Sequence, residues 1–155
     1  MRQLIAQENR LDDFLLASRG LAAAGGAKAG RAALGAAARQ GIDLSGFRAK
    51  PATPADFRNF ELLLAMDTDS RNRLLDMAPA GYENRVHCLL DFAPWIGTDD
   101  VPDPTFGGED AADDVFELLL LALRGLIEVI DQSSADLTLP VQALAPVNLK
   151  ASSSR

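Results

Sequence analysis

Unbroken apolar runs at three places along the chain have the length and composition of buried β-strands. Residues 14–17 are Phe-Leu-Leu-Ala, residues 60–66 are Phe-Glu-Leu-Leu-Leu-Ala-Met, and a similar pattern recurs at residues 85–92. Such runs are typical of parallel sheets, whose strands are covered on both faces. We therefore expect three strands from these segments.

Helical spacing is clearest near the end of the chain, at residues 110–131. Apolar side chains recur there every three or four positions and form one face of a helix: Val115, Leu118, Leu119, Ala122, Leu126 and Ile130. Asp110, Asp113 and Asp114 favour its N-terminus, where the helix dipole attracts negative charge. Strands that alternate with helices predict an α/β fold built on a parallel sheet.

Shorter helices are expected in the first half of the chain. Residues 1–10 have a helical pattern with no capping residue ahead of it, and the alanine-rich residues 27–40 end at Gly41, a residue type that commonly terminates helices. A loop through Gly25 and Gly26 should precede the second of these helices.

Capping residues predict two further helix starts. Thr53, directly followed by proline, has the pattern of an N-cap and first turn. Either Asp69 or Ser70 is placed to cap a helix at about residues 70–77. The long stretch at residues 93–109, rich in proline and glycine, predicts a loop that is either functional or disordered.

The composition fits one domain of a soluble, cytoplasmic protein. The formal net charge of −7 disfavours binding to nucleic-acid phosphates or to anionic membranes. No apolar stretch reaches the roughly 18 residues of a membrane span. The single cysteine, Cys88, rules out an internal disulfide and a multi-cysteine metal site. We expect a domain over residues 1–132 and a disordered tail, rich in Ser, Pro and Ala, over residues 133–155.

Five segments resemble the low molecular weight protein-tyrosine phosphatases, in the same order and with compatible spacing. The resemblance extends from about residue 4 to about residue 131. It is carried by Gly-Ile-Asp-Leu-Ser-Gly at 41–46, Ala-Lys-Pro-Ala-Thr-Pro-Ala-Asp-Phe at 49–57, Leu-Leu-Leu-Ala-Met-Asp at 62–67, Leu-Leu-Asp-Phe-Ala-Pro at 89–94 and Val-Pro-Asp-Pro-Thr-Phe-Gly-Gly at 101–108.

The resemblance implies a three-layer fold, with a four-stranded parallel sheet flanked by helices, and hydrolysis of phosphomonoesters through a phosphocysteine. In this family a Cys-x5-Arg loop cradles the phosphate and lowers the pKa of the nucleophilic thiol. An aspartic acid protonates the leaving oxygen, and Asp103, followed by Pro104, matches that motif. Phe106 keeps one aromatic side chain of the substrate cleft, although Thr105 stands where the family has tyrosine. No metal or cofactor is expected.

The nucleophile of the family has no counterpart in this sequence. Cys88 is followed by Leu-Leu-Asp-Phe-Ala-Pro, so the arginine is missing and no glycine or serine builds an anion cradle. We interpret Cys88 as a buried strand residue that acts as a small hydrophobic side chain. His87 adjoins it and should face the opposite way, which argues against a Cys–His pair.

Further segments depart from the family pattern. Residues 17–21 are Ala-Ser-Arg-Gly-Leu where the family has Asp-Ser-Ala-Gly-Thr, and residues 22–26 lack the aromatic side chain that lines the cleft. The resemblance also places Met1 within the first helix of the family domain, so we expect the first strand and the phosphate loop to be missing. Strands at 14–17 and 60–66 would then lose their common neighbour, which predicts marginal stability or self-association.

The sequence leaves three functions open. The first is a tyrosine phosphatase, acting on a phosphotyrosine protein or a small phosphomonoester, whose sequence starts here at an internal methionine. The second is a non-catalytic pseudophosphatase that keeps the fold and binds a protein partner. The third, arsenate reduction, needs thiols, and a single buried cysteine argues against it. Without the nucleophile loop, we expect the chain as written to be inactive.

Overall fold

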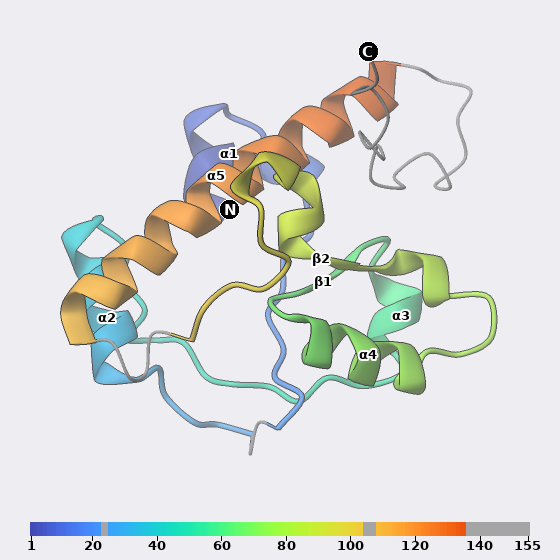
Figure 1. Ribbon diagram of the computed structural model, residues 1–155, viewed down its shortest axis with the longest axis horizontal. Coiled ribbons are helices and arrows are strands. Elements are labelled where there is room, and N and C mark those ends of the chain that lie inside the picture. Colours follow the sequence, from blue (N-terminus) through green and yellow to red (C-terminus); the bar gives the residue numbers. More distant parts are fainter. Residues whose placement is uncertain (23–24, 104–107, 136–155) are drawn as a thin grey trace, which may run out of the picture.

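The computed structural model describes residues 1–22, 25–103 and 108–135, and the structural statements below concern these residues. The helices are α1 (Arg2–Gln7), α2 (Arg31–Arg39), α3 (Asp56–Asn59), α4 (Thr68–Met77) and α5 (Gly108–Ala135), and the strands are β1 (Leu63–Ala65) and β2 (Val86–Cys88). Short 3₁₀ turns are η1 (Leu11–Asp13), η2 (Glu83–Arg85), η3 (Leu89–Phe92) and η4 (Pro94–Ile96). Figure 1 shows α5 running diagonally across the molecule, with its first turns beside α2.

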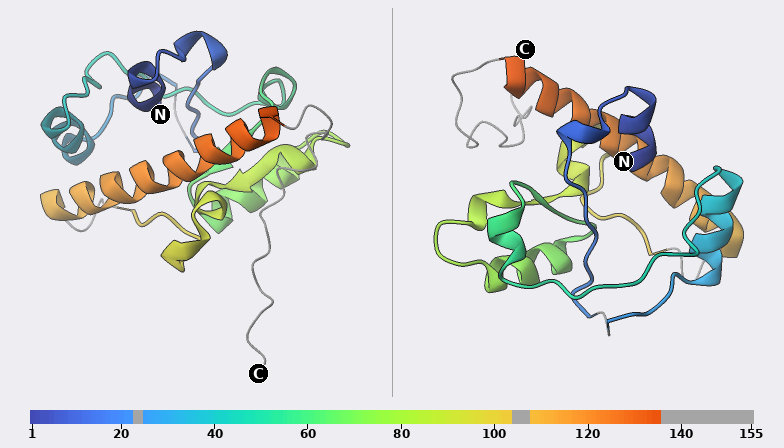
Figure 2. Two further views of the ribbon diagram at one scale, coloured as in Figure 1. Left: turned by 90° about the horizontal axis from the view of Figure 1, so that it is seen from above. Right: turned by 180° about the vertical axis from the view of Figure 1, so that it is seen from behind.

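The two strands pair in parallel, with Leu63 opposite Val86 and Ala65 opposite Cys88, and α4 lies in the connection between them. Alternate residues of β1 face opposite sides of this sheet, as its pleat requires. Leu63 and Ala65 pack toward α3 and α4, whereas Leu64 packs toward η3 and α5. The sheet therefore lies between two layers of helices, which confirms the expected three-layer α/β fold (Figure 2).

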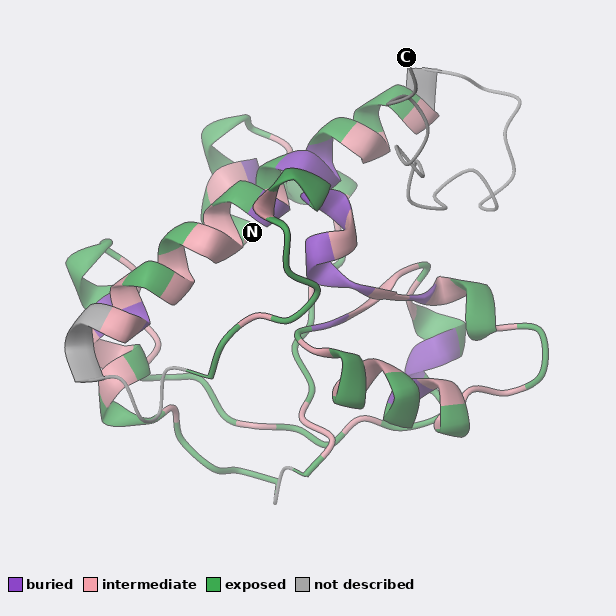
Figure 3. Cartoon of the chain, viewed as in Figure 1, coloured by how far each residue is buried: buried purple, intermediate pink, exposed green. Residues whose placement is uncertain are grey.

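Two clusters of the buried core lie one on each side of the sheet. Their fully packed members are Phe57, Ala65, Leu74 and Val86 on the α3–α4 side, and Leu89, Leu90, Ala93 and Ala122 on the α5 side. Figure 3 shows the buried residues gathered along the strands, η3 and the facing side of α5. Because a buried large apolar side chain contributes about 1.5–3 kcal/mol, these clusters hold both helical layers on a very small sheet.

The strands are shorter than their apolar runs predict. Residues 14–17 form no strand, and Leu15 is 75% exposed, so that prediction is wrong. The run at 60–66 yields only the three residues of β1, and the run at 85–92 yields β2 followed by η3. A strand needs a hydrogen-bonded neighbour, and among the described residues β1 pairs on one side only.

Helix ends differ from the predicted ones in their capping residues. Gly41 follows α2 with a φ of 71°, as expected, but α2 begins at Arg31 instead of residue 27. Asp67 caps α4, accepting a hydrogen bond from the Ser70 amide at 2.6 Å, so neither Asp69 nor Ser70 is the cap. Thr53 does not cap α3 either, because it donates to the Asp56 carboxylate instead of accepting from the helix.

The last helix extends beyond its predicted range of 110–131, from Gly108 to Ala135. Residues 133–135 are therefore helical although the sequence assigned them to a tail, and residues 136–155, predicted to be disordered, lie outside the described residues. Neither α5 nor any shorter helix in the described chain has the length and apolarity needed to cross a membrane.

Gly125 fixes how closely α5 approaches the turns between β2 and the acidic loop, which is residues 97–103 after η4. A Cβ atom at this position would collide with the carbonyl oxygen of Phe92 and lie 3.1 Å from the indole of Trp95. The collision is with backbone, which cannot rotate away as a flexible side chain would. Only glycine therefore permits the observed contact between α5 and η3.

We expect Gly125→Ala to lower the free energy of unfolding by about 1–3 kcal/mol, because the added methyl group overpacks this contact. Urea unfolding followed by circular dichroism measures the change. Gly46→Ala is the matched control, since a Cβ at Gly46 would meet no atom within 4 Å. Equal stabilities of the two variants would contradict the close approach.

Candidate functional site

The acidic loop after η4 is attached to the carboxyl end of β1. Gly97 turns the chain with a φ of 78°, and the Val101 amide then donates to the carbonyl of Met66 at 2.7 Å. Asp103 follows this anchor by two residues and is exposed. Ligand sites of parallel α/β sheets lie at the carboxyl ends of their strands, so the anchor places Asp103 at the edge where such sites occur.

A second pair of hydrogen bonds ties the acidic loop to the first turn of α4. One Asp100 carboxylate oxygen accepts from both the amide and the hydroxyl of Thr68, each at 2.7 Å. Together with the Asp67 cap, this places two carboxylates at the positive end of α4, where they are stabilised by free amides and the helix dipole. The loop that leads to Asp103 is thus held from two sides.

The structure describes only part of the predicted site. Asp103 is described, whereas Pro104, Thr105 and Phe106 lie outside the described residues, so the aromatic wall expected at Phe106 stays a prediction. Within the described chain, no group of three or more His, Cys, Asp or Glu side chains could hold a metal ion.

Cys88 lies at the end of β2 with a buried side chain, 3% exposed. Burial raises the pKa of its thiol, and the nearby Asp91 carboxylate raises it further. The Cys88 amide donates to Asp91 at 3.0 Å, which fixes the strand end against η3. A buried thiol with a raised pKa stays protonated near neutral pH and is a poor nucleophile, which confirms the interpretation of Cys88 as a small hydrophobic residue.

His87 has its own partners. Its Nε2 atom lies 3.0 Å from the carbonyl of Asn84, and its ring meets Phe92 edge-on at 5.9 Å between centroids. The burial of β2 alternates, with Val86 and Cys88 buried and His87 only half-buried between them. These contacts support a structural role for His87 and agree with the expectation that it does not pair with Cys88.

A buried ionic network lies at the start of α3. The Asp56 carboxylate accepts from the amide of Thr53 at 2.8 Å, from its hydroxyl at 2.9 Å and from Nε of Arg19 at 3.0 Å. Burial opposes ionisation of Asp56, but these donors and the Arg19 charge outweigh it, so the pKa of Asp56 lies below its ordinary value. Sequence reasoning missed the network, although the Thr-x-x-Asp spacing is a signal for it.

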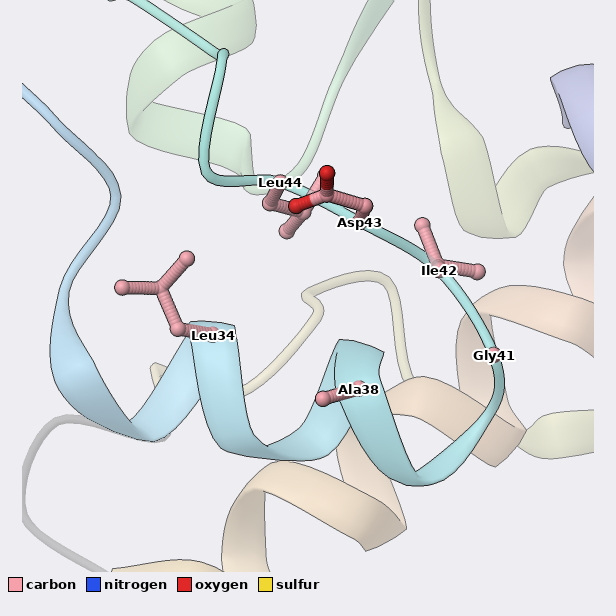
Figure 4. Close-up of a pocket in the computed structure, with 6 residues that line it drawn as sticks. All are labelled: Leu34, Ala38, Gly41, Ile42, Asp43 and Leu44. Atoms are coloured by element: carbon pink, nitrogen blue, oxygen red, sulfur yellow. The ribbon is translucent and has the colours of Figure 1, made fainter.

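A hollow of about 400 Å³ separates α2 from the segment that follows it (Figure 4). Leu34 and Ala38 of α2 line one side, and Ile42, Asp43 and Leu44 line the other. The Asp43 carboxylate accepts from the Ser45 amide at 2.8 Å, and hydrogen bonds from Ser45 lower its pKa. Apart from Asp43, the lining of the hollow is apolar, and no second polar side chain faces that carboxylate across it, so the hollow gives no support to a catalytic site.

The model of the family described as low molecular weight phosphotyrosine protein phosphatase matches residues 1–136. The chain belongs to this family. A Synechocystis protein described as a low molecular weight protein-tyrosine-phosphatase is 38% identical over 81 residues, which are 52% of each chain. The low molecular weight protein-tyrosine-phosphatase YfkJ of Bacillus subtilis is 35% identical over 72 residues, 45% of each chain. The matched segments thus span about half of the length of these phosphatases.

Solved structures of phosphatases extend this likeness to most of the fold. A crystal structure of the protein tyrosine phosphatase from Entamoeba histolytica, with Hepes in its active site, superposes with a TM-score of 0.79 at 27% sequence identity. The superposition covers 86% of this chain and 85% of that one. The family resemblance inferred from the sequence motifs is confirmed.

We expect Asp56→Asn to lower the free energy of unfolding by about 1–3 kcal/mol at neutral pH, because an uncharged amide cannot accept from all three donors. The folded-state pKa is depressed, so the carboxylate stabilises the chain fully above its unfolded pKa of about 3.9. That stabilisation is lost as the pH falls through the lower folded-state pKa. Urea titrations at a series of pH values measure the difference in unfolding free energy between the parent chain and Asp56→Asn.

The exposed Asp12→Asn variant is the control, and its unfolding free energy should follow that of the parent chain. A penalty for Asp56→Asn that grew as the pH fell would contradict the depressed pKa.

Proposed function

We propose that this chain carries the scaffold and acid loop of a low molecular weight phosphotyrosine phosphatase, with Asp103 as the general acid and Phe106 as a wall of the substrate cleft. We further propose that the chain as written does not hydrolyse phosphomonoesters. The observation that carries this second proposal is Cys88, the single cysteine of the sequence, which is buried at a strand end with a raised thiol pKa.

The chemistry explains why the acid is insufficient alone. A thiolate must form a bond to phosphorus while the bond to the leaving oxygen breaks, and the acid gives that oxygen its proton. Water then cleaves the phosphocysteine, with the same carboxylate taking the proton. Asp103 supplies the proton transfer in both steps, but no group of the described chain supplies an accessible thiolate.

Two forms of this proposal differ in what accompanies the scaffold. In the first, the natural product includes an upstream Cys-x5-Arg loop and acts in the cytoplasm on a phosphotyrosine protein or small phosphomonoester. In the second, the chain is a pseudophosphatase that binds a protein partner. The second form is favoured because residues 17–21 depart from the family pattern. In this segment Arg19 replaces the family's alanine, and its side chain donates to Asp56 and to the Ser18 carbonyl at 3.0 Å each.

Self-association of the 155-residue chain is supported by β1, which among the described residues has a strand partner on one side only. An edge of another copy can pair with its other side, and Met66, the residue after β1, is an exposed apolar side chain. The acidic balance of the chain argues against nucleic-acid or membrane partners.

We expect the 155-residue chain to hydrolyse para-nitrophenyl phosphate no faster than its Cys88→Ala variant. Release of para-nitrophenolate at 405 nm (about the absorbance maximum) measures both rates. Turnover that disappears in Cys88→Ala would contradict the proposal, because it would make Cys88 a nucleophile in spite of its burial.

Genomic sequence upstream of Met1 distinguishes the two forms. If it encodes the Cys-x5-Arg loop, we expect the longer chain to be active and Asp103→Asn to lower its kcat about 10²–10⁴-fold, as loss of a general acid does. Asp99→Asn, in the same acidic loop, is the matched control and should leave kcat unchanged. Equal rates for the Asp103→Asn and parent chains would contradict the role of Asp103.

A further inference from the structure

Positive charge is concentrated in one part of this acidic chain. The chain as a whole has 22 acidic residues against 15 basic ones. Residues 14–55 reverse this balance, because Asp43 is their single acidic residue while their basic residues are Arg19, Lys28, Arg31, Arg39, Arg48 and Lys50. This basic segment follows the lower edge of the molecule in Figure 1 and passes through α2.

Two lysines of this segment line the same hollow. The hollow has a volume of about 220 Å³ and is formed by residues 18–20, 27–29, 47, 49 and 50, and we call it the basic hollow. Both Lys28 and Lys50 belong to its lining. The remaining lysine of the chain, Lys150, lies outside the described residues. Phe47, 51% exposed, adds an aromatic ring to the lining.

Backbone hydrogen bonds hold the two sides of the basic hollow together. The Gly20 amide donates to the carbonyl of Lys50, and the Ala49 amide donates to the carbonyl of Ala27, both at 2.8 Å. The Gly26 amide donates to Ala49 at the same distance. These bonds fix the spacing of the lysine backbones, so the hollow exists before any partner binds.

The lysine charges are available to a partner, in contrast to the neighbouring arginines. Arg19 is paired with Asp56, and Arg39 is paired with Asp113 at 2.9 Å. The ammonium groups of Lys28 and Lys50 make no ion pair with the described residues, and both side chains are exposed. Their field is therefore not neutralised locally.

We propose that the basic hollow is a docking surface for an acidic segment of a partner protein, with Lys28 and Lys50 contacting carboxylates and Phe47 contacting an apolar side chain between them. Complementary charge steers such a segment to the hollow, and an exposed aromatic ring provides an anchor of low conformational entropy. A short peptide suits the basic hollow because it can contact the basic segment alone. An extended nucleic acid would also approach the acidic remainder of the chain, which repels phosphates.

The test uses the 155-residue chain and a fluorescein-labelled octapeptide of glutamate and aspartate with one central phenylalanine. Fluorescence anisotropy at low ionic strength measures its binding. We expect Lys28→Glu combined with Lys50→Glu to weaken binding about tenfold or more, and Phe47→Ala to weaken it severalfold. Rising salt should weaken binding to the parent chain, because it screens exposed charges.

Arg124→Glu is the matched control, since Arg124 is exposed on α5, outside the basic hollow, and forms no ion pair with the described residues. Its affinity should equal that of the parent chain, and urea unfolding establishes that each variant is folded. An equal loss in Arg124→Glu would overturn the proposal, since binding would then follow net charge alone.

Three other results would also overturn it. The first is an absence of binding, and the second is tighter binding of a single-stranded DNA octamer than of the peptide. The third is a dimer, detected by sedimentation equilibrium, that Lys28→Glu and Lys50→Glu abolish while the peptide fails to compete, which would assign the basic hollow to a second copy of the chain. The outcomes do not depend on phosphatase activity, so they are separate from the proposed function.

Discussion

The buried carboxylate of Asp56 is the interaction on which the arrangement of the first half of the chain depends. Among the described residues it is the one buried side chain that carries a charge, being 6% exposed, and it adjoins the fully buried Phe57. An unpaired buried charge costs several kcal/mol, so the network must be complete for the chain to fold as it does. Thr53 and Arg19 complete it from two segments far apart in sequence, and they thereby attach the segments that form the basic hollow to the sheet layer.

The length of the strands is limited by the number of neighbouring strands with which they pair. Leu63 and Leu64 come from a run that is apolar enough for burial on both faces, yet each is only half-buried. With one ladder partner, β1 has three residues in place of the seven of its apolar run. Residues 14–17 likewise pair with no strand in the described part of the chain, although their composition favours a strand. Backbone pairing, more than side-chain composition, therefore decides the extent of strands here.

The sequence predicted the parts of this protein that follow from local chemistry. The α/β pattern, the end of α2 before Gly41, the long amphipathic α5 and the buried state of Cys88 depend on spacing and residue type. The parts it did not predict depend on partners distant in sequence. Asp67 caps α4 while Asp100 binds the same turn from a loop 32 residues away from Thr68, and Arg19 finds Asp56 across 37 residues. The role of Asp103 stays a prediction from motif resemblance, and the hydrogen bonds by which Val101 and Asp100 hold the loop before it could be found only from coordinates.

The parallel pairing of β1 and β2 across α4 also has a consequence for the order of folding. This unit is contained within residues 63–88, whereas the ion pair that joins α2 to α5 links Arg39 to Asp113, 74 residues apart. Closing the longer loop costs about 1 kcal/mol more entropy than closing the shorter one. Proteins gain local contacts faster than distant ones, so we expect the strand–helix–strand unit to form before the contact between α2 and α5.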